Sequence, residues 1–517
     1  MVQSLRCVPE WAIITGADFS TGAVKFLAFN LDGEVVASVR LPTDLWHGDP
    51  PEEGLSELNL MQLEGQVRAS VRAIAARLRE AGRLDDWAAA GISATHHTAG
   101  RIDKDRVQVR RAICWNDHTL ALYHQRGLRR LGGQKRVREL IGGPWAIRYS
   151  LSHLVKDEAC LPESDWRRTW RILPHGPLAA GWMTGNFDQI SMSSAASTGI
   201  MDLRTGQWEP KMLECLANAE YRRLAWEQLP RIVDQFEPIG PLAEHLALEA
   251  GIPLDRRPLV FPTSDDQQAG LVGGGAVEAG QVAVVLGNSA VVNSSGSQPP
   301  QSGHLDVMRL NWGPYLWMRC YNNGAGLLHH VFGEKPPFEK LEQQAQKVPP
   351  GCQGVSVLPF VAPEPSRNIV KPCFRWLPKE PRQAGVKFRA CLEAIAYLIA
   401  LGIREHEQAG QTIRRITVSG GIARSDLMCR ILASVLGRRL ERLVSDEGPA
   451  LGAAVTALAA LETYRRRQQG DQEPFQVADA VAVLVKFRDP VDPVPEWVPT
   501  YQKGLADFEK RIQKLGR

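Results

Sequence analysis

Three short polar turns along the chain carry groups that could bind a phosphate. In the first, at residues 18–22, Asp18, Ser20 and Thr21 stand close together, and Lys25 follows them. Small residues let backbone N–H groups approach an anion, and hydroxyls add further donors. A carboxylate beside such a turn can hold a metal ion through water. A simple hairpin with a solvated aspartate has the same composition, so both interpretations stay open for this turn taken alone.

The second and third turns combine glycine with small or apolar residues and follow expected strands. A strand–glycine–helix junction lets a nucleotide lie against the backbone, although a tight turn alone would use the same residues. The residues concerned are Gly287, Asn288 and Ser289 in the second turn, and Gly420, Gly421 and Ile422 in the third, which stands between an expected strand at 415–418 and an expected helix at 426–436.

Two adjacent carboxylates, Asp265 and Asp266, precede a glycine-rich stretch with helical character. An aspartate in this position usually caps the helix. A carboxylate there could instead take a proton from a substrate hydroxyl. Two aspartates are more than one cap needs, so the pair is a candidate for acid–base chemistry.

A mixture of polar and aromatic residues in the first quarter of the chain is typical of polyol recognition, although loops with a packed tryptophan look the same. The residues are His97, Trp115, Asn116 and Asp117. The basic clusters at 126–138 and 465–467 are expected to be solvated helix faces, and no nucleic-acid partner is expected.

The elements that must position these residues follow from the spacing of apolar side chains. Asp32-Gly33 is a strong hairpin signal, so the chain opens with a meander. Strand–turn–strand units recur near residues 18 and 288, and each could open one half of a two-lobed α/β molecule with mixed sheets. An irregular segment is expected at 472–500, before a last helix. The expected strands are 11–16, 23–30, 34–40, 87–93 and 282–286, and the expected helices are 60–81, 426–436 and one from Tyr501.

Composition excludes several classes of protein. The 517 residues are 44% apolar and carry a formal net charge of +4, so the chain can bury a core and does not require an anionic partner. Nine scattered cysteines without a Cys-x-x-Cys pair argue against a disulfide scaffold. No apolar run is long enough to span a bilayer. A cytoplasmic protein without a membrane partner is expected.

Taken in order, these features resemble the FGGY family of carbohydrate kinases, from about residue 12 to about residue 462. Each motif is weak alone, and their shared order over most of the chain carries the resemblance. The motifs are 16–25 (first phosphate motif), 266–275 (catalytic aspartate), 284–289 (second phosphate motif), 392–396 and 419–425 (late helix and adenosine motif) and 447–454 (closing helix).

The resemblance implies an α/β fold of the two-lobed, actin-like kind shared by sugar kinases, Hsp70 and actin, with an interlobe cleft. It implies an N-terminal lobe at 1–258, a C-terminal lobe at 259–490 and a tail helix at 491–517.

The resemblance also implies ATP-dependent phosphorylation of a small-molecule sugar. Asp266 would be the general base, and a slip of one residue in register would give that role to Asp265. Asp18 would hold Mg²⁺. The implied ATP-binding residues are Ser20, Thr21, Lys25, Gly287, Asn288, Ser289, Gly420, Gly421 and Ile422, and the implied sugar-binding residues are His97, Trp115, Asn116, Asp117 and Asp266.

Within the family, the N-terminal half is most similar to xylulokinases, whose Trp-Asn-Asp motif falls on residues 115–117 and whose Gln-Met-His-Gly motif falls on 95–98. Thr95 and Thr98 depart from that second motif, residues 191–194 replace an Asp-rich segment, and Asn288 replaces a threonine. A pentulose such as D-xylulose is the expected substrate. Ribulose, sedoheptulose or another polyol, a non-catalytic sugar sensor and an ATPase acting on protein partners stay alternatives, as does a homodimer.

Overall fold

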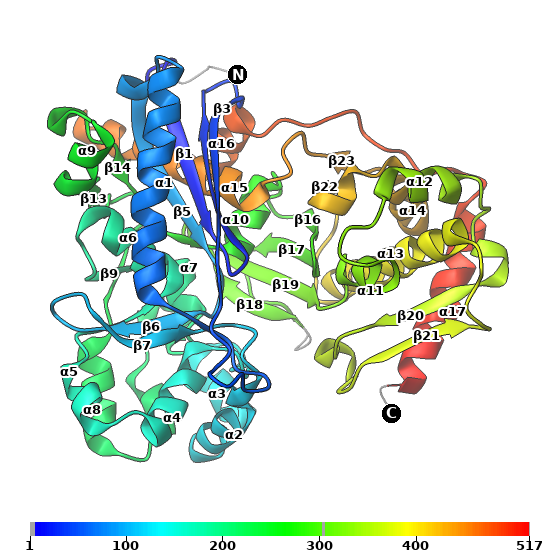
Figure 1. Ribbon diagram of the computed structural model, residues 1–517, viewed down its shortest axis with the longest axis horizontal. Helices are drawn as coiled ribbons and strands as arrows, with labels where there is room; N and C mark the ends of the chain where they lie inside the picture. The colour runs from blue at the N-terminus through cyan, green and yellow to red at the C-terminus, as the bar shows by residue number, and fades with distance from the viewer. Residues whose placement is uncertain (1–5, 302–304, 516–517) are drawn as a thin grey trace. The chain divides into compact units, whose positions relative to one another are not determined.

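The computed structural model describes residues 6–301 and 305–515 (Figure 1). The chain groups into two compact units that interleave along the sequence. Unit 1 comprises residues 1–273, 307–315 and 449–485, and unit 2 comprises 274–306, 316–448 and 486–517. The α/β class with mixed sheets is confirmed. The predicted domains were each continuous in sequence, and their boundaries at 258 and 490 stay a prediction.

Unit 1 is built on a seven-stranded sheet in the order β13-β14-β5-β1-β2-β3, with β15 also paired to β5. The strands of unit 1, in this sheet and in smaller ones, are β1 (Ile13–Phe19), β2 (Ala23–Phe29), β3 (Val35–Pro42), β4 (Glu57–Leu58), β5 (Trp87–Ala94), β6 (Ala99–Ile102), β7 (Gln108–Ile113), β8 (Arg171–Pro174), β9 (Gln189–Ser191), β10 (Met201–Asp202), β11 (Gln207–Trp208), β12 (Arg231–Val233), β13 (Gly240–Pro241), β14 (Leu259–Val260) and β15 (Ser264–Asp265). Its helices are α1 (Leu60–Glu80), α2 (Ala121–Arg130), α3 (Gln134–Ile141), α4 (Ser150–Cys160), α5 (Glu163–Arg168), α6 (His175–Thr184), α7 (Met192–Ala196), α8 (Ala219–Gln228), α9 (Glu244–Ala250), α10 (Asp266–Gly273), α15 (Gly448–Gln468) and α16 (Val477–Leu484).

The opening meander and the helix after it are confirmed. β1 pairs antiparallel with β2, and β2 pairs antiparallel with β3. Asn59 caps α1 by accepting a hydrogen bond from the backbone N–H of Met61. The apolar positions of α1 recur at helical spacing and are buried in the core of unit 1 beside this sheet: Leu60, Leu63, Val67, Val71, Ile74 and Leu78.

Helix α15 packs with its backbone directly on the sheet of unit 1. A Cβ atom at Gly16 of β1 would lie 1.8 Å from the carbonyl oxygen of Ala450. A Cβ atom at Gly452 of α15 would lie 1.9 Å from the carbonyl oxygen of Ala269 in α10. Such approaches exclude any side chain. The glycines therefore fix α15 against β1 and against the helix that follows the acidic pair.

Unit 2 contains most of a six-stranded sheet in the order β18-β19-β17-β16-β22-β23. In both units a strand that begins an antiparallel hairpin also pairs in parallel with a later strand: β1 with β5, and β16 with β22. The strands of unit 2 are β16 (Gln281–Leu286), β17 (Ala290–Gly296), β19 (Tyr315–Tyr321), β20 (Ser356–Phe360), β21 (Cys373–Leu377), β22 (Arg415–Ser419) and β23 (Glu441–Arg442). Residues 307–309 of β18 (Asp306–Arg309) belong to unit 1. The helices are α11 (Gly326–Phe332), α12 (Phe338–Gln346), α13 (Ala384–Gln408), α14 (Asp426–Leu436) and α17 (Val498–Leu515).

The C-terminal region differs from the prediction in one respect. Residues 472–500 were expected to be irregular, but they contain helix α16, whose Val477, Ala480, Val481 and Leu484 are buried. The acidic and proline residues that suggested irregularity lie mostly after this helix.

The last helix, α17, is packed on α13 within unit 2 through a buried polar network. Arg389 donates to the Tyr501 hydroxyl (2.7 Å) and to Glu393 (3.1 Å), and the Tyr501 hydroxyl donates to Glu393 (3.1 Å).

Within the described ranges, no helix is long and apolar enough to cross a membrane.

Candidate functional site

Three parallel strands of unit 1 bring the acidic residues to one edge of the sheet. In the register of β1 and β5, Asp18 pairs with Ser93, and in the register of β15 and β5, Asp265 pairs with Ala94. The carboxyl ends of parallel strands are where open α/β sheets place their ligands. Residues 18 and 19 were expected in a turn, but β1 continues through Phe19, so Asp18 is a strand residue.

Asp18 is held by a neighbour that the sequence did not single out. The Ser93 hydroxyl donates to Asp18 Oδ1 (2.9 Å), and both residues are buried. Lys25 lies opposite Asp18 in the β1–β2 register, so their side chains share one face of the sheet.

The two adjacent aspartates do different work. Asp265 caps α10, because its Oδ1 accepts the backbone N–H groups of Gln267 and Gln268 (2.9 Å each). Its Oδ2 accepts a hydrogen bond from the Ser193 hydroxyl, which in turn accepts the Asp265 backbone N–H (3.0 Å). Both oxygens of Asp265 are thus engaged in holding the start of the helix.

Asp266, the first residue of α10, makes only long hydrogen bonds. Its Oδ1 accepts the backbone N–H of His96 (3.3 Å) and the side-chain amide of Gln267 (3.4 Å). Desolvation, together with the like charges of Asp265 and Asp18, raises the pKa of the Asp266 carboxyl well above its ordinary value. Weak partners and a raised pKa are the properties of a carboxylate that can accept a proton.

The first phosphate turn is internally hydrogen bonded in unit 1. The backbone N–H of Ser20 donates to the carbonyl of Ala23 (3.1 Å), and that of Thr21 donates to the Thr95 hydroxyl (3.1 Å). Thr95, one of the departures from the xylulokinase motif, therefore supports this turn.

His97 is locked in place between two rings. Its imidazole stacks on His96 (centroids 3.7 Å apart) and on Tyr149 (4.3 Å), and its backbone has a φ of 57°. His97 Nδ1 lies 2.9 Å from the Ser197 carbonyl oxygen, which can only accept, so Nδ1 carries the hydrogen.

The other ring nitrogen of His97 is available to a ligand. Nε2 is buried and has no hydrogen-bond partner among residues 6–301 and 305–515. Burial, the neighbouring His96 and Arg148 lower the pKa of His97 well below its ordinary value, so the ring is neutral and Nε2 is an acceptor.

The Trp-Asn-Asp motif divides between surface and core. The Trp115 side chain is 39% exposed, and its Nε1 lies 3.5 Å from the Thr21 hydroxyl oxygen, so it stands beside the first turn. The Asn116 side chain accepts from the Ser56 hydroxyl (3.0 Å). Asp117 is buried and accepts backbone N–H groups from Ser56 (3.1 Å) and Thr119 (2.8 Å). Asp117 thus fixes the loop that presents its two neighbours.

In unit 2, the second and third turns lie side by side. β16 and β22 are parallel, with Val285 opposite Ser419, so the turn at 287–289 and the junction at 420–422 follow adjacent strand ends. Gly420 has a φ of +96°, and a Cβ atom there would lie 2.5 Å from the carbonyl oxygen of Leu286. Only glycine fits this position.

The exposed sides of these two turns are open. Asn288 is exposed, and a Cβ atom at Gly421 would meet nothing within 4 Å, while Ile422 is buried beneath. The loop before α11 supports the turn from behind, because the backbone N–H of Gly324 donates to the Asn288 carbonyl (3.0 Å) and that of Ala325 to the Gly287 carbonyl (2.9 Å).

Oxygen and nitrogen donors that could hold a cation gather near the acidic pair. One ligand atom each from His96, Asp265 and Asp266 lies within 4.8 Å of the others. Both Asp265 oxygens are already hydrogen bonded, and an imidazole is a poor ligand for Mg²⁺. The Asp18 carboxylate, whose charge acts on Asp266, is an oxygen donor of the kind that a hard cation prefers.

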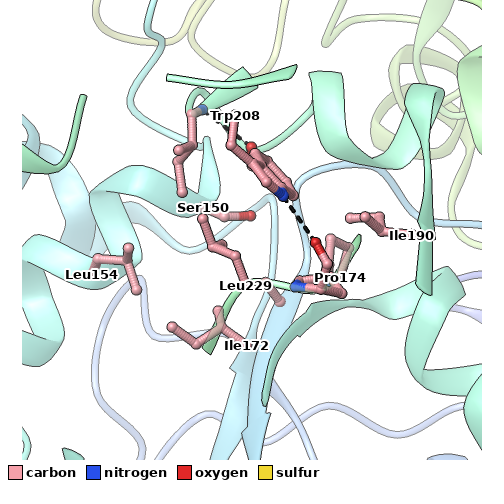
Figure 2. A pocket seen from close by; sticks show the side chains of 11 residues that line it. Ser150, Leu154, Ile172, Pro174, Ile190, Trp208 and Leu229 are labelled. Carbon is pink, nitrogen blue, oxygen red and sulfur yellow. Dashed lines mark hydrogen bonds between the residues drawn. The ribbon is translucent and has the colours of Figure 1, made fainter. Parts of the chain in front are cut away.

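A small cavity elsewhere in unit 1 has no room for a sugar. Its volume is about 10 Å³, no more than one water molecule needs. Figure 2 shows its walls, where the Trp208 indole donates to the Pro230 carbonyl (2.8 Å). The labelled residues around it are Ser150, Leu154, Ile172, Pro174, Ile190, Trp208 and Leu229.

The sequence singled out Ser193 only as part of the departure at 191–194, and it did not single out Ser93 or Tyr149. Serines and tyrosines are common, and nothing in their local sequence marks a partner some 50 to 75 residues away. Pairing at the ends of parallel strands could have suggested Ser93, because a strand was predicted at 87–93, but its place beside β1 was not predicted.

Comparison with known proteins gives a consistent result. Residues 13–273 match the N-terminal domain of the FGGY family of carbohydrate kinases, and residues 282–461 match its C-terminal domain. A xylulose kinase of Escherichia coli is 28% identical over 469 residues, covering 85% of this chain and 88% of the relative. Among solved structures, a ligand-bound xylulose kinase and a gluconate kinase, both from Lactobacillus acidophilus, each superpose with a TM-score of 0.82 at 18% identity, covering 98% of both chains.

Proposed function

The chain belongs to the FGGY family of carbohydrate kinases, and we propose that it uses ATP to phosphorylate a free ketose, a pentulose such as D-xylulose. Membership in a kinase family implies ATP as the phosphoryl donor and a small sugar as the acceptor. The relatives named xylulose kinase support the choice of a pentulose. The observation that carries the proposal is that Asp265 caps a helix, whereas Asp266 makes only long hydrogen bonds and can accept a proton.

Asp266 is the general base of the proposed reaction. Its raised pKa makes it a better proton acceptor than an ordinary carboxylate, and its hydrogen bonds are weak enough to be replaced by one to a substrate hydroxyl. As the hydroxyl oxygen attacks the γ-phosphorus, the bond from that phosphorus to the β–γ bridging oxygen breaks, ADP leaves, and the hydroxyl proton passes to Asp266. Phosphoryl transfer otherwise needs positioning and charge stabilisation.

Asp18 would hold Mg²⁺, with Ser93 fixing its carboxylate. The cation would neutralise charge on the β- and γ-phosphate oxygens. Lys25, on the same face of the sheet, adds positive charge near the phosphates. Because the backbone N–H groups of Ser20 and Thr21 and the Ser20 hydroxyl are already hydrogen bonded, the Thr21 hydroxyl is the side-chain donor that this turn would offer.

In unit 2, the turn at Gly287, Asn288 and Ser289 would bind phosphate, and Gly420, Gly421 and Ile422 would support the adenosine. These two segments follow the adjacent ends of β16 and β22. This supports the two roles, because one ATP molecule must reach both its phosphate contact and its adenosine contact.

The sugar would contact His97, Trp115 and Asn116. His97 Nε2 would accept a hydrogen bond from a sugar hydroxyl, and Trp115 would offer a ring face. Asp117 would act by holding the loop that carries Trp115 and Asn116. A homodimer and a cytoplasmic location stay predictions.

A coupled assay of ADP release with Mg·ATP tests the proposal across free ketoses, aldoses, polyols and sugar acids. We expect the strongest stimulation with D-xylulose. Stimulation by ribulose or sedoheptulose instead would keep the mechanism and assign the change in specificity to Thr95, Thr98 and residues 191–194. ADP release without any sugar would favour an ATPase, and binding of sugar without turnover would favour a sensor.

A further inference from the structure

The segment that carries the acidic pair is held at both ends by one residue of unit 1, Asn311. The side-chain amide of Asn311 donates to the carbonyl of Thr263 (3.0 Å), just before the pair. The backbone N–H of Asn311 donates to the side-chain Oε1 of Gln268 (2.7 Å), just after the pair. Thr263, Gln268 and Asn311 are all buried.

A third bond connects Asn311 to the helix that braces Asp265. Its Oδ1 accepts the backbone N–H of Ser193 in α7 (2.9 Å), and the Ser193 hydroxyl is the group that both donates to and accepts from Asp265. Both polar atoms of the Asn311 side chain are therefore hydrogen bonded, Nδ2 to the segment at 263–268 and Oδ1 to Ser193, which supports Asp265.

Asn311 is itself held in a tight turn. The backbone N–H of Leu310 donates to the Pro314 carbonyl (2.8 Å), and that of Gly313 donates to the Leu310 carbonyl (2.9 Å). Gly313 has a φ of +114°, which favours glycine. A side chain on a rigid turn can fix its partners more closely than one on a mobile loop.

We propose that Asn311 is a positioning residue for Asp266. Within residues 305–515 and 6–301, Asn311 makes no hydrogen bond to Asp266. It acts through Thr263, Gln268 and the Ser193–Asp265 pair, which together fix the backbone from which the Asp266 carboxylate extends. The inference rests on the proposed role of Asp266 as the base.

The test is a double-mutant cycle between Asn311 and Asp266. Asn311→Ala removes two hydrogen bonds, and we expect kcat to fall about 10- to 100-fold, because small misplacements of a reacting group are costly. The KM for ATP should stay within about twofold. In the background of Asp266→Ala, Asn311→Ala should cause no further loss of kcat, because there is no base left to position.

A matched control is Asn186→Ala. The Asn186 side chain also makes two hydrogen bonds to backbone groups of unit 1, donating to the Ile239 carbonyl (3.0 Å) and accepting the Asp188 N–H (3.1 Å). It should lower kcat in neither background. Asn311→Asp provides a milder variant, because it keeps the acceptor for Ser193 and loses the donor to Thr263; it should also lower kcat.

Equal losses of kcat from Asn311→Ala with and without Asp266 would overturn the proposal, since they indicate a merely structural role. Unchanged kcat in both the alanine and the aspartate variants would overturn it as well. Wild-type turnover by Asp266→Ala alone would instead reject the base assignment, and that result is distinct from either of the others.

Discussion

Replacing Asp266 and Asp265 one at a time by asparagine separates catalysis from helix capping. The two substitutions are chemically identical and adjacent. Asp266→Asn removes the proton acceptor. Asp265→Asn keeps an oxygen for the N–H groups of Gln267 and Gln268, and asparagine caps helices about as well as aspartate. Only the first substitution should therefore abolish phosphoryl transfer.

The expected sizes follow from the geometry. Loss of a general base costs about 10²–10⁴ in kcat, which corresponds to about 2.7–5.4 kcal/mol of activation free energy. Asp265→Asn should lower kcat less than about tenfold, because its oxygens bond to the helix and to Ser193 and leave the reacting groups untouched.

Asp266→Asn should lower kcat but raise the stability of the folded protein. Its folded-state pKa is raised, so its contribution to stability is present at low pH and is lost as the pH rises through the raised value. Above the ordinary carboxyl pKa, the raised folded-state pKa of Asp266 therefore lowers the stability of the fold, and Asp266→Asn should raise the Tm at pH 7.

The acid limb of the pH profile supplies a third measurement. The base must be ionised, so kcat/KM should fall as the pH drops through the raised pKa of Asp266, above the ordinary value of 3.8. Asp265→Asn removes a like charge and should shift this limb to lower pH.

Steady-state kinetics with saturating Mg·ATP and thermal unfolding of the same preparations give all three quantities. A variant with asparagine at 266 that turns over like the wild type, beside an inactive one with asparagine at 265, would refute the reasoning and move the base by one residue.

Three further substitutions test the fold and the sugar site. Asp157→Asn should lower the free energy of unfolding by about 3–5 kcal/mol in urea titrations, because it leaves the buried Arg101 and the part-buried Arg110 without their carboxylate. Gly16→Ala should abolish soluble protein or lower the Tm sharply, because the new Cβ would overlap the Ala450 carbonyl, whereas Gly22→Ala has open space and should leave the Tm unchanged. His97→Phe keeps a stacked ring without the Nε2 acceptor and should raise the KM for the sugar about tenfold with the KM for ATP unchanged in the ADP-release assay.

Local features of the structure were predictable because local sequence specifies them. The opening meander follows from alternating apolar runs and the Asp32-Gly33 turn, and α14 spans the expected residues 426–436. The missed helix α16 is a case where proline and acidic residues nearby outweighed a short apolar repeat.

The sequence by itself determined the α/β class and which turns carry small polar residues, since each depends on neighbours within a few positions. The tertiary structure alone decided which aspartate is fully hydrogen bonded and which is left weakly bonded, because Ser193, the distant partner of Asp265, lies 72 residues from it, and Asn311, which holds Ser193, lies 46 residues from it. The tertiary structure also decided that Asp117 holds its loop by a hydrogen bond from the backbone N–H of Ser56, and that Tyr149 stacks on His97. Hydrogen bonds and stacking between distant segments depend on how the sheet registers align those segments, and no local spacing encodes that alignment.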